Sequence, residues 1–206
     1  MQRESGSRYS HAVAVPRRRG SRQLIGYSPK LKRRVTLSSR AAFEVWLIFE
    51  ADPQVVTFCE RPLLIETAEG SRLADFWLRF EDHEEFVVIE DDSQNEEVAI
   101  EGEALPLRYI TRAELAAARI WVNNWEQMLP VINANVGLER KGLEDNILKF
   151  LETPQRLMDI EREYTVGDPG PVRACVFESL RKGQVAAPSL RTESLRLITP
   201  FMRPLQ

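Results

Sequence analysis

The sequence predicts a mixed α/β domain followed by a small winged-helix domain. A helix-forming segment at residues 40–50 precedes a series of short β-prone runs, which is the order expected of an α/β or α+β domain. Farther along, three short helix-forming segments precede two β-prone runs, the order of elements in a winged helix, which is a variant of the helix-turn-helix. We therefore expect three parts: a basic N-terminal arm at residues 1–35, a mixed-sheet domain at residues 36–136 and a winged-helix domain at residues 143–206.

The elements of the mixed-sheet domain follow from caps, prolines and β-branched residues. Ser38 or Ser39 can cap the first helix, which ends before Pro53 because the residue before a proline avoids the α conformation. A capping box at residues 111–114 opens a second helix, which we expect to end at about Leu129, just before the next proline. Between these helices, short runs rich in Val, Ile, Phe and Trp predict strands at residues 55–59, 63–65, 73–80 and 86–89.

Glycine and aspartate mark the elements of the C-terminal part. Gly137 and Gly142 indicate a linker between the two domains. Asp168 can cap the last of three short helices, and Gly183 can end it. We expect these helices at residues 144–151, 154–163 and 168–183, and the hairpin of the winged helix at residues 184–187 and 195–199.

The net charge of −3 hides a strong separation of charge along the chain. Residues 1–40 carry a net charge of +10, residues 41–103 one of −15 and residues 104–206 one of +2. The arm has little apolar surface, so we expect it to be extended or partly disordered. Its cations either neutralise DNA phosphates or form an ordinary solvated tail. The candidate DNA-binding residues in the arm are Arg17, Arg18, Arg19, Lys30, Lys32, Arg33 and Arg34.

Several classes of protein are excluded by what the sequence lacks. No run reaches the roughly 18 consecutive apolar residues of a membrane-spanning helix, so we expect no membrane partner. The N-terminal segment lacks the apolar stretch of a signal peptide. Cys59 and Cys175 are far apart and match no metal or redox spacing. We therefore expect a cytoplasmic protein.

Four carboxylates in apolar surroundings are the candidate catalytic residues. Glu44 is the one charge in an otherwise apolar stretch of the first helix, and Asp75 lies inside a predicted strand, where an acid has low β propensity. Glu90 ends the next strand, and Asp92, two residues on, lies on the same face if the strand continues. Each acid has an ordinary alternative. Glu44 can pair with Arg40 or reach solvent, and the others can form a solvated acidic rim.

If the strands that contain Asp75 and Glu90 pair around the polar turn at residues 81–84, the two carboxylates meet at one rim of the sheet. Carboxylate oxygens with open water positions suit a hard divalent cation. Such an ion lowers the pKa of its bound water and stabilises negative charge on a phosphoryl oxygen. The acids therefore predict metal-assisted hydrolysis, with a solvated rim as the alternative.

The spacing of these acids resembles the core of the PD-(D/E)xK restriction-endonuclease-like superfamily, because Asp75 is followed fifteen positions later by Glu90-Asp91-Asp92. The segment from Ser39 to Glu90 is also similar to the N-terminal catalytic domain of TnsA, the endonuclease subunit of heteromeric bacterial transposases. The shared features are the helix with Glu44, the turn Asp52-Pro53-Gln54-Val55 and the pair Asp75-Phe76. The C-terminal half resembles that family only in its winged-helix layout.

This resemblance implies a restriction-endonuclease-like fold and a DNA endonuclease. Members of the family cut the 5′ ends of the transposon on the non-transferred strand with Mg²⁺, for which Mn²⁺ can substitute, while a DDE transposase cuts and joins the 3′ ends. Their C-terminal domain contacts an ATP-dependent regulator protein. Carried over by position, Glu44, Asp75 and Glu90 are the metal ligands, and these three together with Asp92 form the catalytic set. The resemblance also implies a bacterial protein that is associated with the nucleoid when assembled.

Two positions depart from the family pattern. The catalytic lysine of the family is replaced by Asp92, and Ala74 stands where a proline is expected before Asp75. Because active enzymes of the wider superfamily sometimes carry Glu or Gln at the lysine position, two interpretations stay open. The chain is either an active endonuclease or a catalytically degenerate scaffold that recruits the transposase or the regulator to DNA. A stand-alone restriction or repair nuclease is a third interpretation.

Three further cations, Arg173, Arg181 and Lys182, lie on the expected recognition helix of the winged helix, where contacts with DNA are expected. However, the middle of that helix is apolar, and Glu178 would repel phosphate. The net charge of +2 in this part of the chain is also small for a DNA-binding surface. Docking of another protein is therefore as good an interpretation as contact with DNA.

Overall fold

The structure is a computed structural model that describes residues 8–14, 23–68, 70–91, 96–137 and 142–204. The chain forms two compact units. The first consists of Met1–Phe49 and Gln54–Ala116, and the second of Glu50–Pro53 and Ala117–Gln206. The segment after Ala117, which was expected to complete the mixed-sheet domain, thus clusters with the C-terminal unit.

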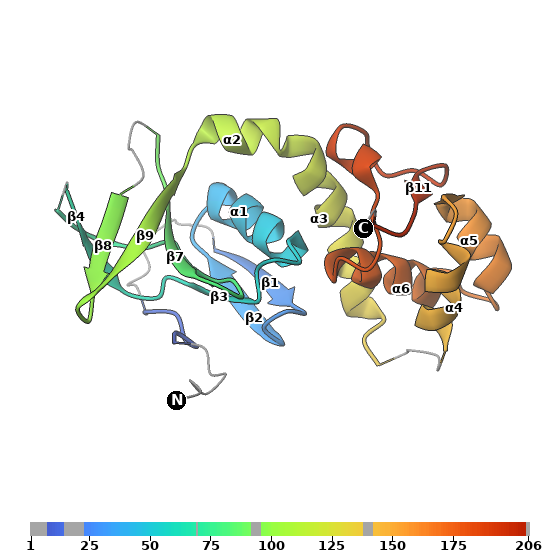
Figure 1. Ribbon diagram of the computed structural model, residues 1–206, viewed down its shortest axis with the longest axis horizontal. Helices are drawn as coiled ribbons and strands as arrows, with labels where there is room; N and C mark the ends of the chain where they lie inside the picture. Colours follow the sequence, from blue (N-terminus) through green and yellow to red (C-terminus); the bar gives the residue numbers. More distant parts are fainter. Residues whose placement is uncertain (1–7, 15–22, 69, 92–95, 138–141, 205–206) are drawn as a thin grey trace. The chain divides into compact units, whose positions relative to one another are not determined.

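A five-stranded mixed sheet forms the centre of the first unit (Figure 1). All neighbouring strands are antiparallel except β7 and β9, which are parallel. The mixed α/β class predicted from the sequence is confirmed: a five-stranded sheet with flanking helices, followed by a mostly helical C-terminal region. The strands in their order across the sheet are β3 (Thr57–Glu60), β6 (Phe76–Arg79), β7 (Glu84–Ile89), β9 (Glu103–Ile110) and β8 (Glu96–Ile100).

The two faces of this sheet are covered by different elements. Helix α1 (Arg40–Ala51) packs on one face, where the rings of Phe49 and Phe76 meet edge to face with centroids 5.3 Å apart. Because successive strand residues point to opposite faces, Trp77 lies on the other face. There the hairpin of β4 (Leu64–Thr67) and β5 (Gly70–Leu73) contributes the buried Ile65, and Tyr9 packs edge to face against Trp77.

The expectation of an extended or partly disordered arm over residues 1–35 is wrong for its last part. Strands β1 (Leu24–Ser28) and β2 (Arg33–Leu37) form an antiparallel hairpin. Val35 and Leu37 are fully buried, so the segment does contribute to the core. The hairpin packs against Trp46 of α1 at Gly26, where a Cβ atom would lie only 2.4 Å from the indole. The prediction was based on the high charge of this segment. In the structure, the burial of Val35 and Leu37 is enough to fix the hairpin in the core.

The strand predicted at residues 73–80 is interrupted. It divides into β5 and β6, and Asp75 lies in the break. The Asp75 N–H donates to the Val87 carbonyl at 2.9 Å, and the Asp75 carbonyl accepts from the Arg61 N–H at 2.8 Å. The chain thus bends at Asp75 without leaving these backbone groups unpaired.

Strands β8 and β9 were not predicted. Their sequence is rich in acids, and Pro106 inside β9 argues against a strand. Nevertheless Leu105, Leu107 and Tyr109 alternate with exposed neighbours along β9, which is the period-two pattern of a strand with one buried face. The charge of the segment concealed this pattern.

The second unit is mostly helical. It contains α3 (Arg119–Ala134), α4 (Leu143–Phe150), α5 (Leu157–Tyr164), α6 (Gly170–Arg181) and the 3₁₀ turn η1 (Pro188–Arg191). The three predicted short helices are therefore confirmed, and Gly183 follows α6 with a left-handed φ of 73°. The helix expected to stop before Pro130 is instead α2 (Arg112–Ala117) followed by α3, which continues through Pro130. Proline removes a helical hydrogen bond and crowds the carbonyl four residues earlier, but the buried Leu129 and Ile132 hold α3 together on both sides of it.

The hairpin predicted for the winged helix is wrong. Residues 195–199 form no strand, and Ala186 makes only an isolated bridge with Met202. A short pair of β10 (Gln155–Arg156) and β11 (Pro200–Phe201) forms instead. The cause is the buried Asn124, whose side-chain amide donates to the Leu190 carbonyl at 2.8 Å and accepts from the Leu195 N–H at 2.8 Å. These bonds fix the intervening loop in an irregular conformation.

Within the described part of the chain, no helix is both long and apolar enough to span a bilayer.

Candidate functional site

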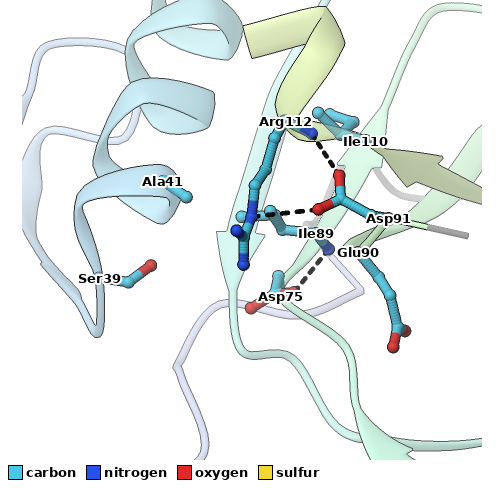
Figure 2. A pocket seen from close by; sticks show the side chains of 8 residues that line it. All are labelled: Ser39, Ala41, Asp75, Ile89, Glu90, Asp91, Ile110 and Arg112. Atoms are coloured by element: carbon cyan, nitrogen blue, oxygen red, sulfur yellow. Dashed lines mark hydrogen bonds and ion pairs between the residues drawn. The ribbon is translucent and has the colours of Figure 1, made fainter. Parts of the chain in front are cut away.

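A pocket of about 540 Å³ opens in the first unit where α1 begins and the strands β6 and β7 meet (Figure 2). Ser39 and Ala41, at the start of α1, line one side of it. Ser39 caps the helix there, because its Oγ accepts from the Ala42 N–H at 3.0 Å. The residues that line the pocket are Ser39, Ala41, Asp75, Ile89, Glu90, Asp91, Ile110 and Arg112. Two of the four predicted catalytic acids, Asp75 and Glu90, are thus brought to one place.

Asp75 is the half-buried carboxylate of the pocket. Its Oδ2 accepts a hydrogen bond of 2.8 Å from the backbone N–H of Ile89 on β7. Burial raises the pKa of the Asp75 carboxyl, the Ile89 N–H and Arg72 lower it, and the negative charge of Glu90 raises it. Glu90 is therefore close enough to act electrostatically on Asp75. A cation between them would offset both the cost of burying the Asp75 charge and the repulsion between the two carboxylates.

Glu90 lies at the end of β7 but is bound elsewhere. Its carboxylate forms an ion pair with Arg72 of β5, and Figure 2 shows its side chain extending away from Asp91 and Arg112. Both partners are partly exposed, with side-chain exposures of 28% for Arg72 and 35% for Glu90. Water that reaches both side chains screens this pair, so Glu90 is not locked to Arg72 as it would be in a buried ion pair.

Arg112 is a functional candidate that sequence reasoning missed, and Asp91 is one that was set aside because it points to the other face of the strand from Glu90. Asp91 accepts from the Arg112 backbone N–H at 2.7 Å and pairs with the Arg112 side chain at 3.1 Å. The predicted capping box is confirmed directly beside them, with the Glu114 carboxylate 2.7 Å from the Thr111 N–H. That motif indicated where α2 begins, and hence that Arg112 is its first residue. Strand β9, which was not predicted, ends at Ile110 in the lining of the pocket and so places the start of α2 there.

Glu44 does not line the pocket. It forms an ion pair of 2.8 Å with Arg40, one turn earlier on α1, and is 28% exposed. This is the ordinary alternative considered from the sequence. An i,i+4 pair of this kind is worth about 0.3–0.5 kcal/mol, so it holds Glu44 only weakly.

The fourth predicted acid, Asp92, lies outside the described residues. Among those that are described, no group of three or more His, Cys, Asp or Glu side chains is arranged to hold a metal ion. Magnesium, however, is often bound by only one or two carboxylates, with water and substrate phosphate completing its coordination. Asp75, together with Glu90 once it leaves Arg72, fits that requirement.

The structure divides the predicted DNA-binding cations of the N-terminal part into two kinds. Lys30 donates to the Phe49 carbonyl at 2.8 Å, near the end of α1, and Arg33 forms two hydrogen bonds of 2.7 and 2.8 Å with the buried Glu60. Lys32 and Arg34 are exposed. Arg17, Arg18 and Arg19 lie outside the described residues.

The predicted cations of the C-terminal part are all paired with glutamates. Arg173 bonds to Glu161, Arg181 to Glu178 and Lys182 to Glu144. Arg181 also approaches the fully buried Glu50 at 3.6 Å. Arg173 and Arg181 lie on α6, and Lys182 follows it directly. Helix α6 has buried positions along its whole length, among them Val172, Val176, Phe177 and Leu180, so it is the central helix of this unit.

The chain matches no protein-family model and no curated protein.

Proposed function

We propose that this chain is a TnsA-like endonuclease subunit that hydrolyses phosphodiesters of the 5′, non-transferred strand at transposon ends and works with a DDE transposase. One observation carries the proposal. Asp75 stands in the break before β6 as a half-buried carboxylate with a raised pKa, facing a pocket at the end of β7 where a second acid follows. A carboxylate with a raised pKa in a pocket is typical of a functional site.

The proposal includes a restriction-endonuclease-like fold for the first unit. It is supported by a helix, α1, that precedes the antiparallel strands β3, β6 and β7, and by the acids at the adjoining ends of β6 and β7. For residues 143–206 we retain a winged-helix relationship as a proposal. The order α4, α5, α6 supports it, and β11, which follows these helices, pairs with β10 at the start of α5.

The residues of the pocket have separate roles in the proposed reaction. Asp75 and Glu90 would hold Mg²⁺ or Mn²⁺, with Glu44 and Asp92 as the further proposed ligands. When bound, such an ion supplies an activated water and stabilises charge on the phosphoryl oxygen. The Ile89 N–H orients the Asp75 carboxylate, and Arg72 holds Glu90 until the cation competes for it.

The proposed partners are transposon-end DNA, the DDE transposase and, through the C-terminal unit, an ATP-dependent regulator protein. The ion pairs on α6 favour the protein partner for this unit, because Arg173, Arg181 and Lys182 already have their charge balanced by glutamates. The assembly would work on the nucleoid in a bacterial cytoplasm.

A second candidate function is a non-catalytic scaffold that recruits the transposase or the regulator to DNA. The observation in its favour is that Glu44, Glu90 and Asp91 each pair with an arginine, so Asp75 is the one predicted ligand in the described residues without such a pair. Asp92 in place of the family lysine points in the same direction.

A strand-specific nicking assay separates the two functions. The assay uses labelled transposon-end DNA, the partner transposase and Mg²⁺, and compares the wild type with Asp75→Asn. The substitution keeps an oxygen for the Ile89 N–H and removes the charge. We expect a loss of cutting of at least about 100-fold, the magnitude typical of removing a group that stabilises transition-state charge. Asp82→Asn is the matched control, because Asp82 is 86% exposed in the turn after β6.

Each outcome of the assay has a distinct meaning. Equal cutting by the wild type and Asp75→Asn would overturn the proposed metal site. If the wild type does not cut but assembles with the transposase, and only Asp92→Lys cuts, the scaffold is supported. Cutting by the wild type without any partner would support a stand-alone nuclease.

A further inference from the structure

Arg112 is placed in the pocket by its backbone rather than by packing of its side chain. It is the first residue of α2, where its N–H is bound by Asp91 at 2.7 Å, and the side chain then enters the pocket (Figure 2). That side chain is 89% exposed, so it fills no space in the core. Its place in the pocket therefore does not come from packing in the core.

The charges around Arg112 leave most of its guanidinium group available. The Asp91 carboxylate engages it through Nε at 3.1 Å, and this orients the terminal nitrogens Nη1 and Nη2 away from Asp91. Glu90 is occupied by Arg72. Among the eight residues that line the pocket, Arg112 is the one cation, and it lies with Asp75 in the same cavity.

The held guanidinium fork of this pocket is suited to the oxygens of a phosphodiester. The planar fork of arginine matches two oxygens of a phosphate in a bidentate contact. Asp75 and Glu90 in the same pocket repel any anion, and Arg112 is the lining group whose charge offsets this repulsion for a phosphate.

We propose that Arg112 binds a backbone phosphate of DNA in this pocket, and that Asp91 is the residue that positions it. The inference rests on the proposed function in that DNA is the ligand, but it requires neither cutting nor a bound metal ion. In this proposal Arg112, at the start of α2, supplies a positive charge to the pocket, where the family lysine is replaced by Asp92.

The test measures DNA binding without metal. A fluorescein-labelled DNA duplex is titrated with the full chain in EDTA, and fluorescence anisotropy gives Kd between about 50 and 200 mM salt. Because each neutralised phosphate contributes about 0.9 to the slope of log affinity against log salt, Arg112→Gln is expected to reduce the slope by about one. We expect an affinity loss of about 3- to 10-fold at the lower salt concentration. Arg112→Lys should keep the slope and lose part of the affinity, because it retains the charge without the fork.

Arg119→Gln is the matched control. Arg119 is also an exposed arginine at the first position of a helix, and it does not line the pocket. An unchanged slope for Arg112→Gln, an equal loss for Arg119→Gln, or no DNA binding by the wild type would each overturn the proposal. The result is distinguishable from failure of the nuclease, because Asp75→Asn should bind DNA in EDTA with the wild-type slope whether or not the wild type cuts.

Discussion

At the scale of one residue, Asp75 of the candidate site lies where its negative charge lowers the stability of the fold. It occupies a position between Ala74 and Phe76, both fully buried, where an apolar residue would continue the core. The fold supplies one backbone N–H to its carboxylate, from Ile89 at 2.8 Å, but burial still disfavours the charge. A group that is held in an unfavourable environment by the surrounding fold is typical of a functional position.

This arrangement predicts how stability depends on pH. The pKa of Asp75 is raised in the folded protein above its ordinary value of 3.8, so the folded state binds the proton more tightly than the unfolded state does. The contribution of Asp75 to stability is therefore present below the ordinary pKa and is lost as the pH rises through the folded pKa. Asp75→Asn cannot ionise, and we expect it to unfold at a higher urea concentration than the wild type near pH 7.

The same urea measurements, repeated toward pH 4, should show the difference between Asp75→Asn and the wild type shrinking. Asp82→Asn provides the comparison, because its carboxylate is exposed and a hydrogen bond from His83 lowers the pKa of Asp82. That variant is not expected to gain stability at neutral pH. A wild type that is more stable than Asp75→Asn at pH 7 would contradict the burial argument.

At the scale of elements, the β1–β2 hairpin packs against α1. Trp46 of α1 is almost fully buried, and Gly26 of β1 lies directly against its ring. Lys30, in the turn of the hairpin, donates to the Phe49 carbonyl, and Arg33 binds Glu60 of β3. Two of the four hairpin cations are thus engaged in holding the hairpin to the unit, which leaves Lys32 and Arg34 as the exposed cations at its tip.

The contact between Gly26 and Trp46 predicts that Gly26→Ala destabilises the first unit. A methyl group would meet Trp46 at 2.4 Å, against the rigid ring rather than a flexible chain end. We expect a loss of about 1–3 kcal/mol in the free energy of unfolding, as for other overpacked cores. Urea denaturation followed by tryptophan fluorescence measures it. Ile25→Ala, at a neighbouring residue that is 65% exposed, should stay within about 0.5 kcal/mol of the wild type.

At the scale of the whole molecule, the separation of charge is partly used inside each unit. Acids of the −15 segment pair with cations of the +10 segment, as in Arg33 with Glu60 and Arg8 with Glu84 and Glu103. In the second unit the cations on α6 are balanced locally by glutamates. The charge that remains for DNA is therefore concentrated in fewer residues than the composition suggests.

Arg17, Arg18 and Arg19 are the cations of the arm most closely grouped in sequence, and we predict that they carry a large part of DNA binding. Replacing all three by Gln should reduce the salt slope of DNA affinity by between about one and three, according to how many contact phosphate. The measurement is fluorescence anisotropy over a range of salt concentrations. Replacing Arg156, Arg162 and Arg196 of the second unit removes the same charge, and an equal loss there would contradict the prediction.

Patterns within short segments were enough to predict much of this fold. Caps, prolines and glycines located α1, α4, α5 and α6, and the capping box at Thr111 is present in the structure. The odd placement of Asp75 among apolar residues was visible in the sequence, and so was the proximity of Glu90 at the end of the next strand. These features depend on neighbours a few residues away, which the sequence displays directly.

The sequence by itself thus determined the α/β order, most helices and the two acids that meet in the pocket. Only the tertiary structure decided that Glu44 stays with Arg40, that Glu90 turns to Arg72 and that Arg112 enters the pocket from α2. It also decided that Asn124 fixes a loop where a hairpin was expected. The pairing of Glu44 with Arg40 was one alternative that helical spacing already offered, and for the other residues the physical reason is the same. Which partner a charged or polar side chain takes depends on distances across the fold, and no spacing along the chain encodes those distances.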